Sequence, residues 1–310
     1  MHNSQVNTSL PLNLSSEIDE GKSAEFWRLG DVVVRRIGFG AKRLAGPGRD
    51  GADVQERAVA LLRRAIELGV NHLDTAAFYP SHGPEGQTHF ESLDWANEVI
   101  RRALAPYPEE LVIATKVGPM KDRLARPDEL RGLVEAELQA LGLDVLDVVY
   151  LRLHGVKSIA EHFGALAELQ AKGMIRQLGV SNVRVEQLQE AREIAPVVAV
   201  QNRYSVGFGR VNDEILGVCG ELGIAFVPFF ALTAESREAG GVPDSDAVQA
   251  IADRHGATAA QVRLAWTLSR GNHVLAIPGT SSQQHLEENL QAGDLILSPD
   301  DLAVLDAITD

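Results

Sequence analysis

The sequence is poor in cysteine and in zinc-ligand patterns. A single cysteine, Cys219, occurs among 310 residues, which excludes a framework of internal disulfide bonds. Nine histidines are present, but no Cys/His pairs fall at the spacing typical of a zinc site. We therefore predict no bound metal and a reducing, intracellular setting, the cytoplasm.

Basic residues are also scarce. Lys and Arg number 29 against 43 Asp and Glu, which gives a net charge of −14 and a pI near 5.1. Without a basic stripe, nucleic acid and anionic membranes are poor electrostatic partners. The composition therefore argues against both of these partners, and it gives no indication of the oligomeric state.

Two further absences limit the class of protein. Met1 to Glu25 is polar and has no apolar core, so it resembles neither a signal peptide nor a membrane span. We interpret residues 1–27 as a mobile tail and residues 28–310 as a single domain. Ser181 and Ser205 lack the Gly-x-Ser-x-Gly elbow, which argues against nucleophilic hydrolysis.

The repeating pattern along the chain is an apolar helix followed by a short strand rich in Val, Ile and Leu. Such strands, when they alternate with helices, form a parallel sheet covered by helices. We expect eight strands, which end near Gly40, Asp74, Lys116, Leu153, Val180, Gln201, Phe229 and Ile277. An N-terminal hairpin precedes them, and extra helices follow towards the C-terminus.

Eight such units in this length predict a (β/α)₈ TIM barrel. The competing fold is a doubly wound sheet, which would require a glycine-rich turn after the first strand. Gly38-Phe-Gly40-Ala-Lys-Arg43 lacks the third glycine of that turn. We therefore prefer the barrel.

Polar residues end several of these apolar strands or follow them directly. In a barrel of this type, the C-terminal ends of the strands carry the active site. The polar residues at these ends are Asp74 and Tyr79 after the second strand, Lys116 on the third, Arg152 and His154 on the fourth, and Gln201 on the sixth.

Asp74, Tyr79 and Lys116 together form a candidate catalytic group. A buried lysine must find an anion or lose its proton, and Asp74 supplies the anion. The charged ammonium would then favour the phenolate form of Tyr79 and lower its pKa from about 10. Taken alone, Asp74 and Lys116 would fit a structural ion pair equally well, but their position at one end of a barrel favours catalysis.

Several motifs resemble the aldo-keto reductase superfamily, from Leu29 to Asp310. They are Gly69-Val-Asn-His-Leu-Asp-Thr-Ala-Ala-Phe-Tyr79, Ile113-Ala-Thr-Lys-Val-Gly118, Gly179-Val-Ser-Asn182, Ile277-Pro-Gly-Thr-Ser-Ser282 and Glu288-Asn289. Two other segments look closest to the bacterial branch that includes pyridoxal reductases: Leu44-Ala-Gly-Pro-Gly48 and Leu146-Asp-Val-Val-Tyr-Leu-Arg152. The resemblance implies reduction of an aldehyde or ketone by NAD(P)H, with Tyr79 as the proton donor tuned by Lys116 and Asp74.

One residue departs from the family pattern. The family usually places a histidine five residues after the aspartate that matches Asp147, where it contacts the substrate carbonyl, but here that residue is Arg152. His154 follows two residues later and shares the side-chain direction of Arg152 along a strand. We favour Arg152 by position and keep His154 as the alternative if the strand bulges.

The resemblance also implies a cofactor site. Its residues would be Gly40 and Ala41 near the nicotinamide ring, Ser181, Asn182 and Gln201 at the carboxamide, Phe229 stacked on the ring, Leu232 and Thr233 at the pyrophosphate, Gly279, Thr280, Ser281, Ser282 and His285 at a 2′-phosphate, and Glu288 and Asn289 at the adenine. Gly279 and His285 replace the Lys and Arg that commonly bind this phosphate. The hydroxyls and a helix N-terminus could still bind it, so we expect NADPH rather than NADH.

The substrate and two other functions remain open at this stage. Lys42 stands where many relatives have an apolar side chain facing the substrate, which suggests an anionic or strongly polar substrate group, although a surface lysine is an equal interpretation. A second function is a cofactor-binding regulatory homologue with little catalysis, which the change to Arg152 favours. A third is a barrel lyase or epimerase in which Lys116 forms a Schiff base.

Overall fold

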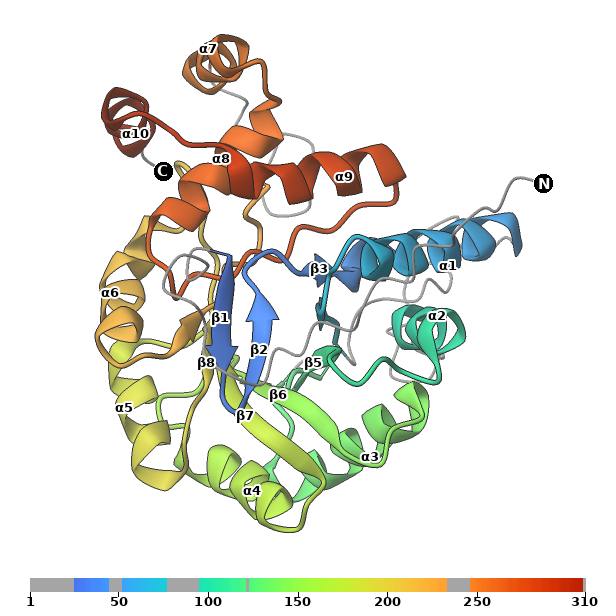
Figure 1. The fold of residues 1–310 in the computed structure, drawn as a ribbon. Coiled ribbons are helices and arrows are strands. Elements are labelled where there is room, and N and C mark those ends of the chain that lie inside the picture. Colours follow the sequence, from blue (N-terminus) through green and yellow to red (C-terminus); the bar gives the residue numbers. More distant parts are fainter. Residues whose placement is uncertain (1–24, 45–51, 77–94, 121–122, 233–245, 309–310) are drawn as a thin grey trace, which may run out of the picture.

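The computed structural model describes residues 25–44, 52–76, 95–120, 123–232 and 246–308. Within these ranges a parallel sheet curls around a central axis, and most of the helices form a ring outside it (Figure 1). A two-stranded antiparallel hairpin lies across one end of the sheet. The hairpin consists of β1 (Phe26–Leu29) and β2 (Val32–Arg35).

Within the described residues, seven parallel strands follow one another around the sheet in sequence order. They are β3 (Phe39–Gly40), β4 (His72–Asp74), β5 (Val112–Val117), β6 (Leu146–Arg152), β7 (Ile175–Ser181), β8 (Ala199–Gln201) and β9 (Ala225–Phe226). The order means that every strand pairs with the next strand along the chain. The intervening helices therefore all pack on the outside, as the alternating sequence pattern predicts.

The segment from Val274 to Pro278 occupies the eighth position and closes the barrel. On one side Val274 forms a parallel bridge to Phe226, and on the other Ala276 forms one to Ile37. The backbone N–H of Gly38 donates to the Ala276 oxygen at 2.8 Å, and that of Gly40 donates to the Pro278 oxygen at 3.2 Å. The predicted (β/α)₈ barrel is confirmed, although its eighth strand is reduced to single bridges.

Most of the helices bury an apolar stripe against the outer face of the sheet, and the others pack on neighbouring helices. Their bounds are α1 (Ala52–Glu67), α2 (Trp95–Leu104), α3 (Leu130–Leu141), α4 (Ala160–Ala171), α5 (Val185–Ile194), α6 (Asp213–Glu221), α7 (Asp246–His255), α8 (Ala259–Ser269), α9 (Gln283–Gln291) and α10 (Pro299–Asp306). Thr258 accepts a hydrogen bond from the Gln261 N–H and forms a capping box at the start of α8. Among the helices of the described ranges, none combines the length and apolar character needed to cross a bilayer.

The hairpin closes the N-terminal end of the barrel. Leu29 and Val34 are fully buried and join a core of interior residues that includes Val148 and Leu275. The side chain of Asn71, just before β4, forms two hydrogen bonds with the backbone of β2. It accepts from the Arg35 N–H at 2.8 Å and donates to the Val33 oxygen at 2.9 Å. The open end of the barrel is therefore the C-terminal one, where the predicted site residues lie.

Most of the predicted tail lies outside the described residues, although Phe26 and Trp27, its last residues, belong to β1. The boundary between tail and domain remains an expectation.

Candidate active site

Asp74 and Lys116 meet at the C-terminal ends of β4 and β5. The Lys116 Nζ atom lies 2.6 Å from Asp74 Oδ1 and donates a second hydrogen bond, of 2.7 Å, to the backbone oxygen of Thr75. Both side chains are almost completely buried, with 2% and 1% exposed. The structure therefore brings together two of the three predicted catalytic residues. The third, Tyr79, lies outside the described residues.

Burial changes the acid–base properties of this site. The pKa of Lys116 is lowered, chiefly because burial penalises its ammonium form, while the Asp74 carboxylate opposes this effect and Arg152 adds to it. His72, which shares β4 with Asp74, is fully buried, and its pKa is lowered to about 4. At neutral pH the imidazole is therefore uncharged and Asp74 is the main counter-ion of Lys116.

Gln201 joins the pair from β8. Its Nε2 atom donates to Asp74 Oδ2 at 2.7 Å, so each carboxylate oxygen of Asp74 accepts a bond from a buried donor. Gln201 Oε1 and the neighbouring Ser181 Oγ are buried and have no hydrogen-bond partner among the residues that the structure describes. Ser181 and Gln201 lie opposite each other in the β7–β8 register, so both atoms lie at the same part of the C-terminal rim. Such atoms need partners, and an amide group such as a nicotinamide carboxamide can supply them.

Arg152 is half-buried at the rim of the barrel, whereas His154 is exposed. Strand β6 pairs with β7 without a bulge, up to Arg152 opposite Ser181. The Arg152 guanidinium lies 5.1 Å from the centre of the Phe229 ring and is half-buried. His154 follows the end of the strand and is exposed. The structure therefore places Arg152 beside Lys116 and Phe229, whereas the bulge that would bring in His154 is absent from this described strand.

The closure of the barrel brings Gly40 and Gly279 into close contact. A Cβ atom on Gly40 would lie 2.6 Å from the Ile277 oxygen, and one on Gly279 would lie 2.7 Å from the Gly40 oxygen. Only glycine fits at such distances. Ala41 is buried beside this contact and Leu232 is half-buried, whereas Thr233 lies outside the described residues.

The residues predicted at the phosphate and adenine gather around the start of α9. Ser282 is the N-cap and accepts from the His285 N–H at 3.4 Å, and Thr280 Oγ1 accepts from the Ser282 N–H at 3.0 Å. Ser281 and His285 are exposed. Further along α9, Glu288 is half-buried and Asn289 is buried. These residues form a helix N-terminus that suits an anion.

Lys42 lies next to an aromatic cluster at the same rim. Its Nζ atom is 5.3 Å from the centre of the Phe230 ring, and the Phe229 and Phe230 rings meet edge to face with centroids 5.0 Å apart. Lys42 itself is half-buried on the turn after β3. The side chain therefore lies at the C-terminal rim, on the same aromatic wall as Arg152.

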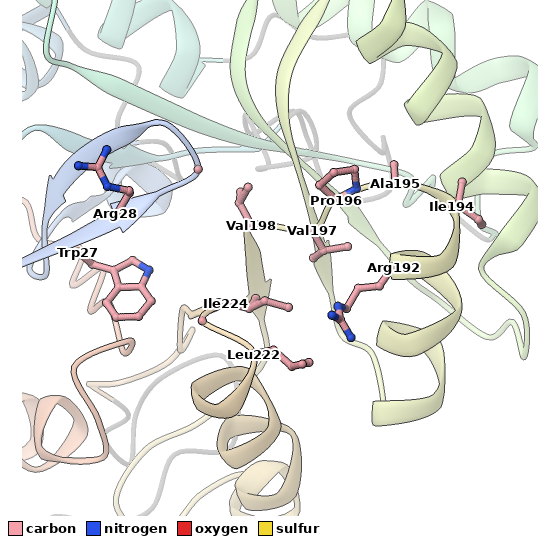
Figure 2. A pocket seen from close by; sticks show the side chains of 12 residues that line it. Trp27, Arg28, Arg192, Ile194, Ala195, Pro196, Val197, Val198, Leu222 and Ile224 are labelled. Atoms are coloured by element: carbon pink, nitrogen blue, oxygen red, sulfur yellow. The ribbon is translucent and has the colours of Figure 1, made fainter. Parts of the chain in front are cut away.

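A groove of about 770 Å³ lies at the opposite end of the barrel (Figure 2). It is lined by Trp27 and Arg28 of the hairpin and by the chain just before β8 and β9, including Pro196 and Leu222. These are N-terminal strand ends, whereas Asp74, Lys116 and Gln201 are at C-terminal ends. The groove is therefore separate from the candidate site.

Sequence reasoning missed a group of buried polar residues behind Lys116. Thr75, Asn97 and Glu137 are linked by hydrogen bonds and are at most 2% exposed. A signal was available, because Glu137 falls three residues after Val134 on the buried face of α3. A carboxylate on an apolar helix face indicates a buried partner.

The comparison with known families agrees with this fold. A model of the aldo/keto reductase family matches residues 36–310. The chain belongs to the aldo/keto reductase family. This assignment fits the barrel and the pair formed by Asp74 and Lys116 at its C-terminal end.

Individual relatives cover nearly the whole of this aldo/keto reductase. Pyridoxine 4-dehydrogenase of Escherichia coli (strain K12) is 41% identical over 302 residues, which cover 93% of this chain and 99% of that protein. Methylglyoxal reductase YeaE of the same organism is 30% identical, over 89% of this chain and 92% of that protein. A crystal structure of an aldo-keto reductase from Klebsiella pneumoniae in complex with NADPH superposes with a TM-score of 0.76 at 28% identity, over 91% of this chain and 94% of that one.

Proposed function

We propose that this protein is an NADPH-dependent carbonyl reductase, which converts an aldehyde or ketone to an alcohol. The observation that carries the proposal is the buried pair of Asp74 and Lys116 at the C-terminal end of an aldo/keto reductase barrel. Removing an ion pair from water costs free energy that its mutual attraction often fails to repay, so stability alone is a poor explanation for this pair and a functional use is a better one. Tuning a proton donor beside it is such a use.

In this proposal Tyr79 donates the proton to the carbonyl oxygen. Lys116, held charged by Asp74, would lower the pKa of the phenol and stabilise the phenolate left behind. Arg152 would take the role of the family histidine and bind the carbonyl oxygen through its N–H donors. Gln201 holds the second oxygen of Asp74 and so fixes the direction of the carboxylate.

The bound cofactor would supply the hydride. Ser181 and Gln201 would hold its carboxamide through the two buried atoms that lack partners within the described chain, Asn182 would assist them, and Phe229 would stack on the ring. The N-terminus of α9, with Thr280, Ser281, Ser282 and His285, would bind a 2′-phosphate. Gly40, Ala41, Leu232, Thr233, Gly279, Glu288 and Asn289 would line the rest of the cofactor. We propose NADPH over NADH because related structures were crystallised with NADPH or NADP.

The proposed substrates are small aldehydes and pyridoxal-like rings, as the similarity to pyridoxine 4-dehydrogenase suggests. Lys42, on the aromatic wall at the rim, would bind an anionic or strongly polar group of the substrate. We also propose that the protein works in the cytoplasm, where its one thiol, the buried Cys219, would stay reduced.

The test is NADPH oxidation at 340 nm with purified protein and a panel of carbonyl compounds. The panel pairs benzaldehyde with 4-carboxybenzaldehyde and includes pyridoxal and methylglyoxal. We expect turnover with NADPH that falls by roughly 10²-fold or more in Tyr79→Phe, because the proton donor is lost. In Lys42→Met we expect a higher KM for the carboxylated aldehyde and little change for benzaldehyde.

Other outcomes would favour the competing functions. Tight NADPH binding without turnover on any carbonyl compound would indicate a regulatory homologue. Substrate trapped on Lys116 by borohydride, with no need for a nicotinamide, would indicate Schiff-base chemistry. An unchanged KM in Lys42→Met would leave Lys42 as a surface residue.

A further inference from the structure

A chain of buried polar groups connects two helices to the strand ends that carry the catalytic pair. Thr75 Oγ1, just after β4, donates to Asn97 Oδ1 of α2 at 2.7 Å. Asn97 Nδ2 lies 3.1 Å from each carboxylate oxygen of Glu137 on α3. Thr115 Oγ1 of β5 donates to Glu137 Oε2. All four residues are at most 2% exposed.

The direction of this chain is fixed by chemistry. An ionised carboxylate only accepts hydrogen bonds, so the Asn97 amide must turn its nitrogen towards Glu137. The amide oxygen then faces Thr75, whose hydroxyl must donate to it. The Glu137 charge therefore determines the orientation of every group as far as Thr75.

Thr75 is also a direct partner of Lys116. Its backbone N–H donates to the Ala114 oxygen at 2.8 Å, and its side chain is held by Asn97. With both of these fixed, its carbonyl oxygen points to the Lys116 Nζ atom at 2.7 Å. A change in this chain of hydrogen bonds therefore reaches the Lys116 ammonium through Thr75.

We propose that Glu137 is a positioning residue for Lys116, acting through Asn97 and Thr75 to fix the carbonyl oxygen that binds the ammonium and adding a negative charge that keeps it protonated. This inference rests on the proposed function of Lys116. A helix-packing role alone would need no charge at this point, and an apolar residue would serve it at lower cost.

Electrostatics supports the geometric argument. Asp74 contacts the ammonium of Lys116 directly, and its other charged or titratable neighbours are His72 of β4, Tyr150 and Arg152 of β6, and Glu137 of α3. Burial and Arg152 lower the pKa of Lys116, whereas Asp74 and Glu137 raise it. His72 is neutral at pH 7 and burial holds the Tyr150 phenol protonated, so these two carboxylates carry the opposing charge.

The experiment measures the titration of Lys116 in the full chain and the pH profile of NADPH oxidation. The chain has six lysines, so ¹³Cε-lysine labelling gives few signals, and Lys116→Arg assigns the one that matters. In Glu137→Gln, which keeps the shape and removes the charge, we expect the Lys116 midpoint and the alkaline limb of kcat to move down by about one pH unit. In Thr75→Val, which breaks the chain and keeps the charge, we expect kcat to fall several-fold with little change in the carbonyl KM.

Asp301→Asn is the matched control. Asp301 is also a buried carboxylate held by several donors, but it caps α10 and is absent from the groups that affect Lys116. This variant should lose stability and leave the titration unchanged.

The outcomes separate the two proposals. An unchanged Lys116 midpoint in Glu137→Gln, or the same shift in Asp301→Asn, would overturn the inference. If Glu137→Gln does not fold, Thr75→Val decides, and an unchanged kcat there would overturn it. Failure of the wild-type protein to oxidise NADPH would count against the proposed function, whereas the NMR titration would still test the charge effect of Glu137.

Discussion

His72 shows how strongly burial acts on single residues of this barrel. It has no exposed surface, and within the described chain neither ring nitrogen has a hydrogen-bond partner. Its pKa is about 4 in the folded protein, against about 6.5 in an unfolded chain. Between these values the unfolded state binds more protons than the folded state.

This difference predicts a loss of stability in acid. The contribution of His72 is fully present above pH 6.5 and is lost as the pH falls towards 4. Between about pH 7 and about pH 5 we expect the free energy of unfolding to fall by about 2 kcal/mol more in the wild type than in His72→Leu, which cannot titrate. Urea unfolding at the two pH values measures this, and equal losses in both proteins would show that His72 is not buried as a neutral group.

The sequence indicated some of the buried polar residues near the candidate site more clearly than others. Asp74 and Lys116 stood out because packing alone seldom accounts for a charged residue at the end of an apolar strand. Asn97 lies within a helix, where a polar residue normally faces solvent, and the position of Glu137 on an apolar helix face indicates a buried partner without identifying it. Their mutual contact depends on the packing of α2 against α3, which no local pattern specifies.

At the scale of elements, Arg36 secures the closure of the barrel. Its guanidinium is buried and donates to the backbone oxygens of Leu268 at 2.6 Å, Gly271 at 2.7 Å and Val274 at 3.2 Å. These oxygens end α8 and begin the segment in the eighth strand position. Burial lowers the pKa of Arg36 to about 10, so it stays charged at neutral pH.

Removing this side chain should destabilise the closure. In Arg36→Met we expect the free energy of unfolding to fall by about 2–4 kcal/mol, because three buried oxygens lose a charged donor. Arg131→Met is the control, since Arg131 forms an exposed pair with Glu135 on α3 and should change stability by less than about 0.5 kcal/mol. Similar losses in both variants would contradict the role of Arg36.

The elements themselves were predictable where the hydrophobic period was clear. The predicted strand ends at Lys116 and Gln201 lie within a residue of the observed ones. The strand that was predicted to end near Phe229 is shorter than expected and is observed only as Ala225–Phe226. The chain also turns away at Phe230, whose φ of 66° is left-handed, and this conformation could not be read from an apolar run.

At the scale of the whole molecule, the two ends of the barrel have different roles. The hairpin and its apolar contacts close the N-terminal end, while charged and polar side chains from β4, β5, β6, β7 and β8 meet at the other. The order of the units along the chain indicated this division, because it fixes where every strand ends. The order of the units did not predict the hydrogen bond between Gln201 and Asp74, because these residues belong to strands that are far apart in the sequence and are not neighbours in the sheet.

The proposed function depends on Asp74 and Lys116 tuning a proton donor for carbonyl reduction. Single-turnover stopped-flow of the protein mixed with NADPH and an aldehyde tests it most directly, with Lys116→Met compared with Lys172→Met, a variant at an exposed lysine. We expect the rate of NADPH oxidation to fall by roughly 10²-fold or more in Lys116→Met, with little change in the Kd of NADPH, and to stay at the wild-type value in Lys172→Met. Equal rates in the two variants would show that Lys116 does not tune the proton donor and is only a structural partner of Asp74.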